Sequence, residues 1–258
     1  MLGIAEDYHT VSNGRISESK TQLRSSSVAD PRVYMACHGL LRPIAPEAAD
    51  AYRIFAPPYP TSPNDLYVAT KLNSYSILGY RYVCSTDSTE MLIFVDGSAF
   101  NNGSPSSRAG YGIVFAPIWS SESTFSGRLE QDGNPQTSNR AELRAALAAL
   151  TLRSWGKEGF SSIVIACDSE YVVKGISKWI FKWRENGWKT ASGHPVINQD
   201  LWNKLEAKLR DVEEQGMLVR FWQIPREWNE ADKYAKIGAV IIFFRSPFFF
   251  GHNEEHLL

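Results

Sequence analysis

The sequence contains little cysteine and lacks any long apolar run. Only three cysteines occur among the 258 residues, at Cys37, Cys84 and Cys167. They are odd in number and widely spaced, which excludes the usual zinc motifs and disulfide frameworks and favours a reducing compartment. The apolar run AVIIFF at 239–244 is soon interrupted by arginine and proline. It falls far short of the about 20 residues that a membrane-spanning helix needs.

The sequence also lacks an excess of charge of either sign. It has 27 Lys+Arg and 28 Asp+Glu, for a formal net charge of −1. Any affinity for nucleic acid must therefore be local rather than global. The N-terminal residues MLGIAEDYHT contain no basic segment followed by an apolar one, and they include acids where a transit peptide has few. We expect an intracellular protein, in the nucleus or the cytoplasm, with no membrane contact.

Composition divides the chain into four parts. Residues 1–31 are polar and rich in serine, and they are expected to be a flexible N-terminal segment. Residues 32–88 contain aromatic and proline clusters without a repeat, and they predict an irregular N-terminal extension. Residues 89–240 are regular and predict a catalytic domain. Residues 241–258 form an apolar C-terminal tail.

The regular part predicts a mixed α/β sheet. Short apolar runs, typical of strands, are followed by turn residues and then alternate with segments of helical periodicity. The expected strands are 91–95, 109–117, 122–130, 161–167 and 217–225, and the expected helices are 137–155, 168–176, 198–215 and 229–239. Strands first and then alternating helices and strands indicate a sheet with helices on its faces.

Four acidic residues stand out in this pattern. Asp96 and Asp168 directly follow apolar runs, which places both at a rim of the predicted sheet. Glu142 lies three, four and seven residues before alanines of its helix, so it shares their packing face. Asp232 lies in the segment NEAD, one turn into the last expected helix.

Each acid taken alone also has a structural interpretation. Asp96 could be a turn residue, Asp168 a helix N-cap, and Asp232 part of a cap with Asn229. Together they form a set of carboxylates at element ends, with no Lys or Arg beside the first two. Such a set needs a cation, and oxygen-only ligands favour Mg²⁺ or Mn²⁺ over zinc.

The stretch KWIFKWRENGWK at 178–189 concentrates tryptophan and positive charge. Two interpretations stay open: an amphipathic helix whose indole rings reach the core, or a surface that binds a charged, stacked polymer. Lysines recur every four residues, at Lys174, Lys178 and Lys182, which predicts one helical stripe.

Seven segments occur in order over roughly residues 89–240: FVDGSAFNNG, RAGYGIVF, TSNRAELRAAL, IACDSEYVVKGI, WIFKWRENGWKT, NQDLWNKL and PREWNEADKYA. Together they resemble ribonuclease H of type 1. The overall style is similar to ribonuclease-H-like proteins of filamentous fungi. The resemblance implies a ribonuclease H-like α/β fold. It has a five-stranded mixed sheet, three antiparallel strands and then two parallel ones, with helices on both faces.

The resemblance also implies an activity. Asp96, Glu142, Asp168 and Asp232 correspond to the family's four metal-binding acids. They would hold two Mg²⁺ ions, with Mn²⁺ as a substitute, for endonucleolytic hydrolysis of the RNA strand of an RNA–DNA hybrid. The products would carry 5′-phosphate and 3′-hydroxyl ends, and the protein would act as a monomer. The alternative is an inactive or weakly active hybrid-binding protein of the same fold.

Contacts to the hybrid follow by the same resemblance. Ser138 and Asn139 would meet sugar hydroxyls and minor-groove edges, because the 2′-hydroxyl distinguishes RNA from DNA. Thr137 and Asn102 would hold a phosphate of the DNA strand, and Glu170 stands where the family often has glutamine. Helix capping is the structural alternative for the segment 137–139.

The tryptophan-rich stretch corresponds to the family's basic protrusion. The lysine stripe would follow the phosphates of the DNA strand. Trp179, Trp183 and Trp188 would pack against its sugars, with a role in the core as the open alternative for the first two.

One position departs from the family pattern. The family commonly has a histidine in the loop before the last acid, whereas Arg226 occupies that loop here. A guanidinium binds phosphate but cannot act as a general base at neutral pH. We expect slower or more metal-dependent turnover from this change.

Overall fold

The structure is a computed structural model that describes residues 53–57, 61–74 and 77–241. The N-terminal segment expected to be flexible, residues 1–31, lies outside the described residues. The apolar tail also lies outside them, apart from its first residue. No helix in the described part of the chain is both long and apolar enough to cross a membrane.

The described residues form one mixed sheet of seven strands. The strands are β1 (Tyr67–Ser74), β2 (Ile77–Cys84), β3 (Glu90–Phe100), β4 (Arg108–Val114), β5 (Thr124–Arg128), β6 (Ser162–Cys167) and β7 (Leu218–Gln223). β3, β4 and β5 pair antiparallel, whereas β6 pairs parallel with β3 and with β7. The five expected strands and their directions are thus confirmed.

Two strands belong to the segment that was expected to be irregular. β1 and β2 form an antiparallel hairpin, and β2 adds to the start of β3 through the pairs Tyr82–Leu92 and Val83–Met91. Since β6 occupies the other edge of β3 there, β2 lies on the same edge as β4. The sequence hides this hairpin because its inward positions include a charged residue, Arg81, which is 2% exposed.

A second part of the extension covers the outer edge of β7. Phe221 pairs with Ile54 in a parallel bridge. The Phe55 amide donates to the Phe221 carbonyl at 2.8 Å, and the Phe221 amide donates to the Arg53 carbonyl at 2.7 Å. Backbone groups on this stretch of the edge strand are therefore satisfied within the chain.

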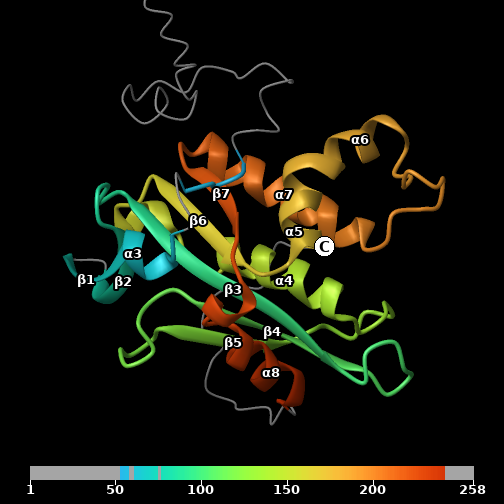
Figure 1. Cartoon of the computed structure of the whole chain (residues 1–258), viewed down its shortest axis with the longest axis horizontal. Coiled ribbons are helices and arrows are strands. Elements are labelled where there is room, and N and C mark those ends of the chain that lie inside the picture. Colours follow the sequence, from blue (N-terminus) through green and yellow to red (C-terminus); the bar gives the residue numbers. More distant parts are fainter. Residues whose placement is uncertain (1–52, 58–60, 75–76, 242–258) are drawn as a thin grey trace, which may run out of the picture. The chain divides into compact units, whose positions relative to one another are not determined.

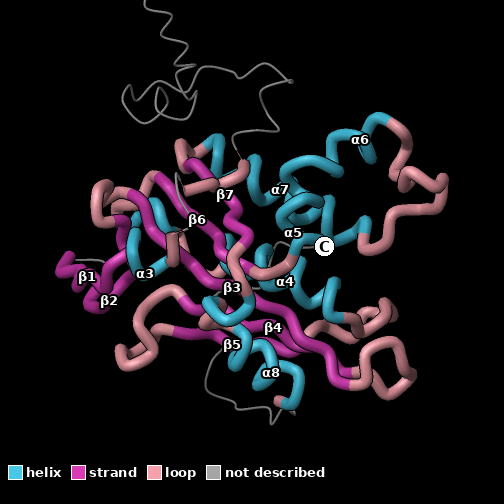
Figure 2. The backbone as a smooth tube through the Cα atoms, viewed as in Figure 1, coloured by secondary structure: helices cyan, strands magenta, loops and turns pink. Residues whose placement is uncertain are grey.

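Helices cover both faces of the sheet (Figures 1 and 2). They are α3 (Pro63–Leu66), α4 (Ser138–Thr151), α5 (Glu170–Lys174), α6 (Ile180–Glu185), α7 (Gln199–Glu214) and α8 (Asp232–Val240), with shorter turns η2 (Trp155–Glu158), η3 (Gly175–Trp179) and η4 (Arg226–Trp228). α4 packs on β3 and β4 from one face, together with α7, while α8 packs on β3, β4 and β5 from the other. This arrangement confirms the expected fold class.

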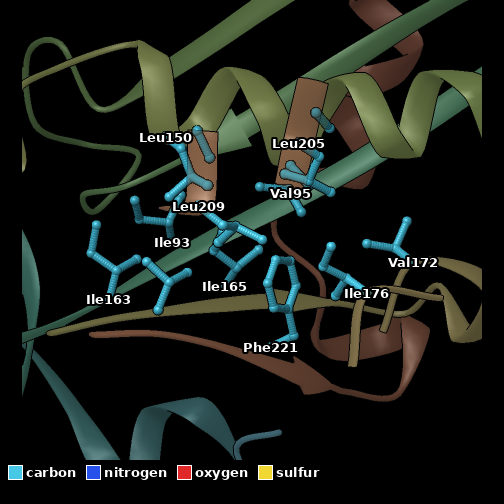
Figure 3. Close-up of a cluster of buried hydrophobic side chains, with 14 of the residues drawn as sticks. Ile93, Val95, Leu150, Ile163, Ile165, Val172, Ile176, Leu205, Leu209 and Phe221 are labelled. Atoms are coloured by element: carbon cyan, nitrogen blue, oxygen red, sulfur yellow. The ribbon is translucent and has the colours of Figure 1, made fainter. Parts of the chain in front are cut away.

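The larger core fills the space between the sheet and the helices α4, α5 and α7 (Figure 3). Its members alternate along each strand, as expected for side chains of period two that point to one face. The labelled residues are Ile93, Val95, Leu150, Ile163, Ile165, Val172, Ile176, Leu205, Leu209 and Phe221.

Gly112 allows α8 to pack closely against the opposite face of the sheet. A Cβ atom at Gly112 would lie 2.4 Å from the Ala235 amide nitrogen of α8. Because Gly112 pairs with Asp96 in the sheet, this contact brings the start of α8 to the level of Asp96.

Candidate active site

Asp96 lies inside β3 rather than at its end. The strand was expected to stop at residue 95, but it continues to Phe100 through pairing with β4. On the other edge, pairing with β6 ends at Phe94–Ala166, and β6 itself ends at Cys167. The chain therefore leaves β6 directly beside Asp96, which brings Asp168 to it.

Glu142 reaches this point because α4 packs unusually close to β3. A Cβ atom at Gly97 would lie 2.1 Å from the Glu142 amide nitrogen, so only glycine allows this approach. Burial raises the pKa of Glu142, a hydrogen bond from the Ser169 hydroxyl opposes this rise, and the charge of Asp168 adds to it. The small packing face inferred from the sequence is present, since its alanines are buried.

We expect Gly97→Ala to destabilise the fold by about 1–3 kcal/mol or more, because the new methyl group overlaps the backbone of α4. The same substitution should displace Glu142 from Asp96 and lower catalysis beyond the loss of folded protein. Urea denaturation and rates corrected for the folded fraction measure both effects. Gly156→Ala is the control, because a Cβ there would meet only the Met217 methyl group, at an ordinary contact distance of 3.6 Å. Full activity and stability of Gly97→Ala would contradict the close approach.

Asp168 is held by a residue whose role the sequence did not predict. The Nδ2 of the buried Asn229 donates to Asp168 Oδ1 at 2.8 Å and to the Val95 carbonyl at 3.0 Å. Its Oδ1 accepts from the Ala231 amide at 3.1 Å. The sequence suggested Asn229 only as a capping residue. The cap of α5 is Ser169, not Asp168, because the Ser169 hydroxyl accepts from the Val172 amide.

Asp232 is the first residue of α8 and contacts two cations of the chain. Arg226 Nη2 donates to Asp232 Oδ1 at 2.7 Å, and Lys236 Nζ donates to Oδ2. Partial burial raises the pKa of Asp232, but the hydrogen bonds from Lys236 and Arg226 outweigh it and hold that pKa below its usual value. Arg226 also approaches Asp168, with Nη1 3.9 Å from Oδ2. The sequence did not single out Lys236.

Among the four acids, Asp96 has the most strongly shifted pKa. It is 4% exposed, and its Oδ2 has no hydrogen-bond partner. Burial, followed by the negative charges of Asp168, Glu142 and Asp232, raises the pKa of Asp96 to about 8. The structure thus brings the four predicted acids within electrostatic reach of one another.

In the metal-free protein, we expect the stability contributed by Asp96 to fall as pH rises. Its folded pKa of about 8 lies above the value of 3.8 for a free carboxyl. Such a group contributes fully below the unfolded pKa, and the contribution is lost as pH rises through the folded pKa. Asp96→Asn should remove this dependence and stabilise the metal-free protein at pH 8 by on the order of 3 kcal/mol. Urea denaturation in EDTA at pH 5 and pH 8 measures it. Parallel pH dependence of wild type and variant would contradict it.

The donor set fits a hard divalent cation. Four carboxylates supply only oxygen, and the buried Asp96 Oδ2 lacks any partner from the chain. Across residues 53–57, 61–74 and 77–241, no three His, Cys, Asp or Glu side chains are arranged as a ready-made metal site. The carboxylates of Glu142, Asp168 and Asp232 accept hydrogen bonds from Ser169, Asn229 and Arg226, respectively.

The polar residues expected to contact the hybrid lie around the start of α4 and in the loop after β3. Thr137 is the N-cap of α4, and its hydroxyl accepts from the Arg140 amide at 3.3 Å. Ser138 is half-buried, whereas Asn139 and Asn102 are exposed. The capping interpretation therefore holds for Thr137, and the side chains of the other three make no contact that would exclude a ligand.

The lysines of the expected protrusion are exposed, but their helix is not continuous. The π-helical turn η3 separates α5 from α6, so Lys174, Lys178 and Lys182 do not follow one uninterrupted α-helix. Lys174 pairs with Glu170 on the first turn of α5.

The three tryptophans differ in burial. Trp183 is 9% exposed, and its ring centroid lies 5.4 Å from that of Trp202 in the core. Trp179 and Trp188 are half-buried and flank Trp183, with centroids 5.8 and 6.3 Å away. The core interpretation therefore describes Trp183, while the outer two retain exposed surface.

Comparison with known proteins identifies the family. The model of the RNase H family matches residues 88–239. A "Ribonuclease H" of Anaeromyxobacter dehalogenans is 43% identical over 123 residues, which cover 47% of this chain and 64% of the relative. A "Ribonuclease H" of Afipia carboxidovorans is 36% identical over 151 residues, which cover 57% of this chain and 91% of the relative. Both relatives are bacterial, and the resemblance to fungal proteins stays a prediction.

A solved structure gives a weaker likeness. "LC9-RNase H1, a type 1 RNase H with the type 2 active-site motif" is 24% identical to this chain, with a TM-score of 0.41. The match covers 58% of this chain and 72% of that one.

Proposed function

The chain belongs to the ribonuclease H family, and we propose that it is a hydrolase that cleaves the RNA strand of RNA–DNA hybrids endonucleolytically. The observation that carries the proposal is the buried Asp96, whose unpartnered oxygen lies within reach of three further carboxylates. Four carboxylates this close repel one another when ionised, and a bound cation offsets that repulsion. The proposed catalytic unit is residues 89–240, supported by the hairpin β1–β2.

Divalent metal ions fit this donor set, and we propose two Mg²⁺ ions, replaceable by Mn²⁺, held by Asp96, Glu142, Asp168 and Asp232. When bound, they supply an activated water and stabilise the leaving 3′ oxygen, so the products carry 5′-phosphate and 3′-hydroxyl ends. The residues of the chain orient these ligands: Ser169 donates to Glu142, and Asn229 donates to Asp168. Both are positioning residues.

Substrate discrimination is proposed to come from the residues beside α4. Ser138 and Asn139 would contact the 2′-hydroxyl and the minor groove, where RNA differs from DNA. Thr137 and Asn102 would hold a phosphate of the DNA strand, with Glu170 at the edge of this surface.

The basic protrusion would bind the backbone of the DNA strand. Its exposed lysines, Lys174, Lys178 and Lys182, supply local positive charge on a chain whose formal net charge is −1. Trp179 and Trp188 would pack against sugars, with Trp183 behind them. We expect Lys178→Ala with Lys182→Ala to weaken hybrid binding. The slope of the logarithm of affinity against the logarithm of salt concentration should become shallower by about 2. Titration of binding against salt concentration measures this slope. Lys157→Ala with Lys208→Ala, in η2 and α7 beside the end of α4 rather than on the protrusion, is the control. An unchanged slope for the protrusion variant would contradict the assignment.

The activity is tested with one RNA sequence in three forms: paired with DNA, paired with RNA, and single-stranded. The proposal predicts cleavage of the hybrid alone, internal cuts, and fragments that a 3′-hydroxyl-dependent polymerase extends. Tight hybrid binding without cleavage in Mg²⁺ or Mn²⁺ would instead support the alternative of an inactive hybrid-binding protein.

A further inference from the structure

Both oxygens of Asp232 are occupied by cations of the chain itself. Arg226 reaches Oδ1 from η4, and Lys236 reaches Oδ2 from the next turn of α8. Arg226 also lies 3.9 Å from Asp168, so one guanidinium bridges two of the four acids. Asp96, by contrast, has a carboxylate oxygen without any partner.

The charges of the four acids and their two cationic partners limit how many divalent ions can bind. With Asp96 ionised, as a metal ligand must be, four carboxylates against Arg226 and Lys236 leave an excess of two negative charges. A single divalent ion balances this excess without moving either side chain. A further divalent ion brings two more positive charges, which only an incoming phosphate or the departure of a cation can offset.

Arg226 is the group that can depart. Its side chain is 68% exposed, and exposed ion pairs contribute only about 0–1 kcal/mol, so its contact with Asp232 exchanges readily. A guanidinium does not lose its proton, so it keeps its positive charge when it leaves the carboxylate for water or for another anion. A phosphate of the substrate is such an anion, and arginine binds phosphate well.

We propose that Arg226 is an internal counter-cation that weakens metal binding at Asp232 until a phosphate of the substrate draws it away. This inference rests on the proposed function, and it makes binding of the second ion depend on substrate. The first ion binds on the side of Asp96, Glu142 and Asp168, and Arg226 links occupation of Asp232 to the arrival of the nucleic acid.

The test measures metal binding without any nucleic acid, so it does not depend on cleavage. Mn²⁺ is titrated into wild type, Arg226→Ala and Arg210→Ala by calorimetry, with free Mn²⁺ followed by electron paramagnetic resonance. Arg210 is an exposed arginine of α7 and serves as the control. We expect wild type and Arg210→Ala to bind one ion with measurable affinity. Wild type and Arg210→Ala should bind a second ion only weakly, and Arg226→Ala should bind that second ion roughly fivefold more tightly than they do, the equivalent of one exposed ion pair.

Arg226→Ala with Asp232→Asn should return to a single ion, which shows that the gained site uses Asp232. The inference is overturned if Arg226→Ala binds Mn²⁺ with the stoichiometry and affinity of wild type, or more weakly. If wild type binds no Mn²⁺ while Arg226→Ala binds one, the counter-cation holds but the first-ion assignment fails. If Mn²⁺ binds as expected but no hybrid is cleaved, the proposed function fails and the inference about Arg226 stands.

Discussion

Asp168→Asn is expected to reduce cleavage of the RNA strand of a hybrid by at least about 100-fold, because even partners of metal ligands cost 10–100-fold when removed. Asp168 lies where β6 ends, beside Asp96, and its carboxylate is oriented by Asn229. An amide at this position keeps the shape and the hydrogen bond from Asn229 but loses the charge that a divalent cation needs. Initial rates at saturating Mg²⁺ measure the loss.

The matched control for this prediction is Asp211→Asn, which neutralises an exposed aspartate of α7 that pairs with Lys208. We expect it to cleave at the wild-type rate. Asp168→Asn should remain folded by circular dichroism and should still bind hybrid. Retention of more than about a tenth of the wild-type rate by Asp168→Asn would remove this residue from the metal-binding set.

Arg81→Ala is expected to lower the free energy of unfolding by about 3 kcal/mol, because the buried Glu158 carboxylate then keeps only Arg153, 3.6 Å away, as a cationic partner. Arg81 Nε and Nη2 donate to the two oxygens of Glu158 at 2.7 and 3.0 Å. The side chains are 3% and 6% exposed, and the guanidinium lies over the rings of Phe115 and Trp155. The pair ties β2 to η2.

Urea denaturation compares Arg81→Ala with Lys208→Ala, which removes a partly exposed ion pair on α7 and should cost less than about 1 kcal/mol. Combining Arg81→Met with Glu158→Gln should recover part of the loss, because neither side chain then carries a buried charge. A loss for Arg81→Ala equal to that of the control would show that the hairpin contributes little to the fold.

The sequence predicted the five central strands because they are short apolar runs bounded by turn residues. It predicted Asp96 and Asp168 because each directly follows such a run, and Glu142 because it shares the alanine face of its helix. Asp232 was added because it lies one turn into the last expected helix. It placed Asp96 one residue beyond its strand, since a carboxylate after an apolar run is typical of a strand end. Pairing with β4 extends the strand past it, and that pairing depends on residues distant in the sequence.

The parts that the sequence did not predict depend on contacts between distant residues. Arg81 is buried only because Glu158 meets it from a distance of 77 positions, so the hairpin appears polar. Arg140 is likewise buried, against Asp200 and Asp132. The π-helical turn η3 and the contact of Asn229 with Asp168 have no local signature. Periodicity along the chain cannot indicate any of these features.

The most direct test of the central claim is a hybrid whose RNA and DNA strands carry different fluorophores, incubated with the full chain in Mg²⁺ and, separately, in EDTA. We predict internal cleavage of the RNA strand in Mg²⁺, an intact DNA strand, and no cleavage in EDTA. An intact RNA strand in Mg²⁺ and in Mn²⁺, from folded protein that binds the hybrid, would contradict the assignment of these four carboxylates to RNA hydrolysis.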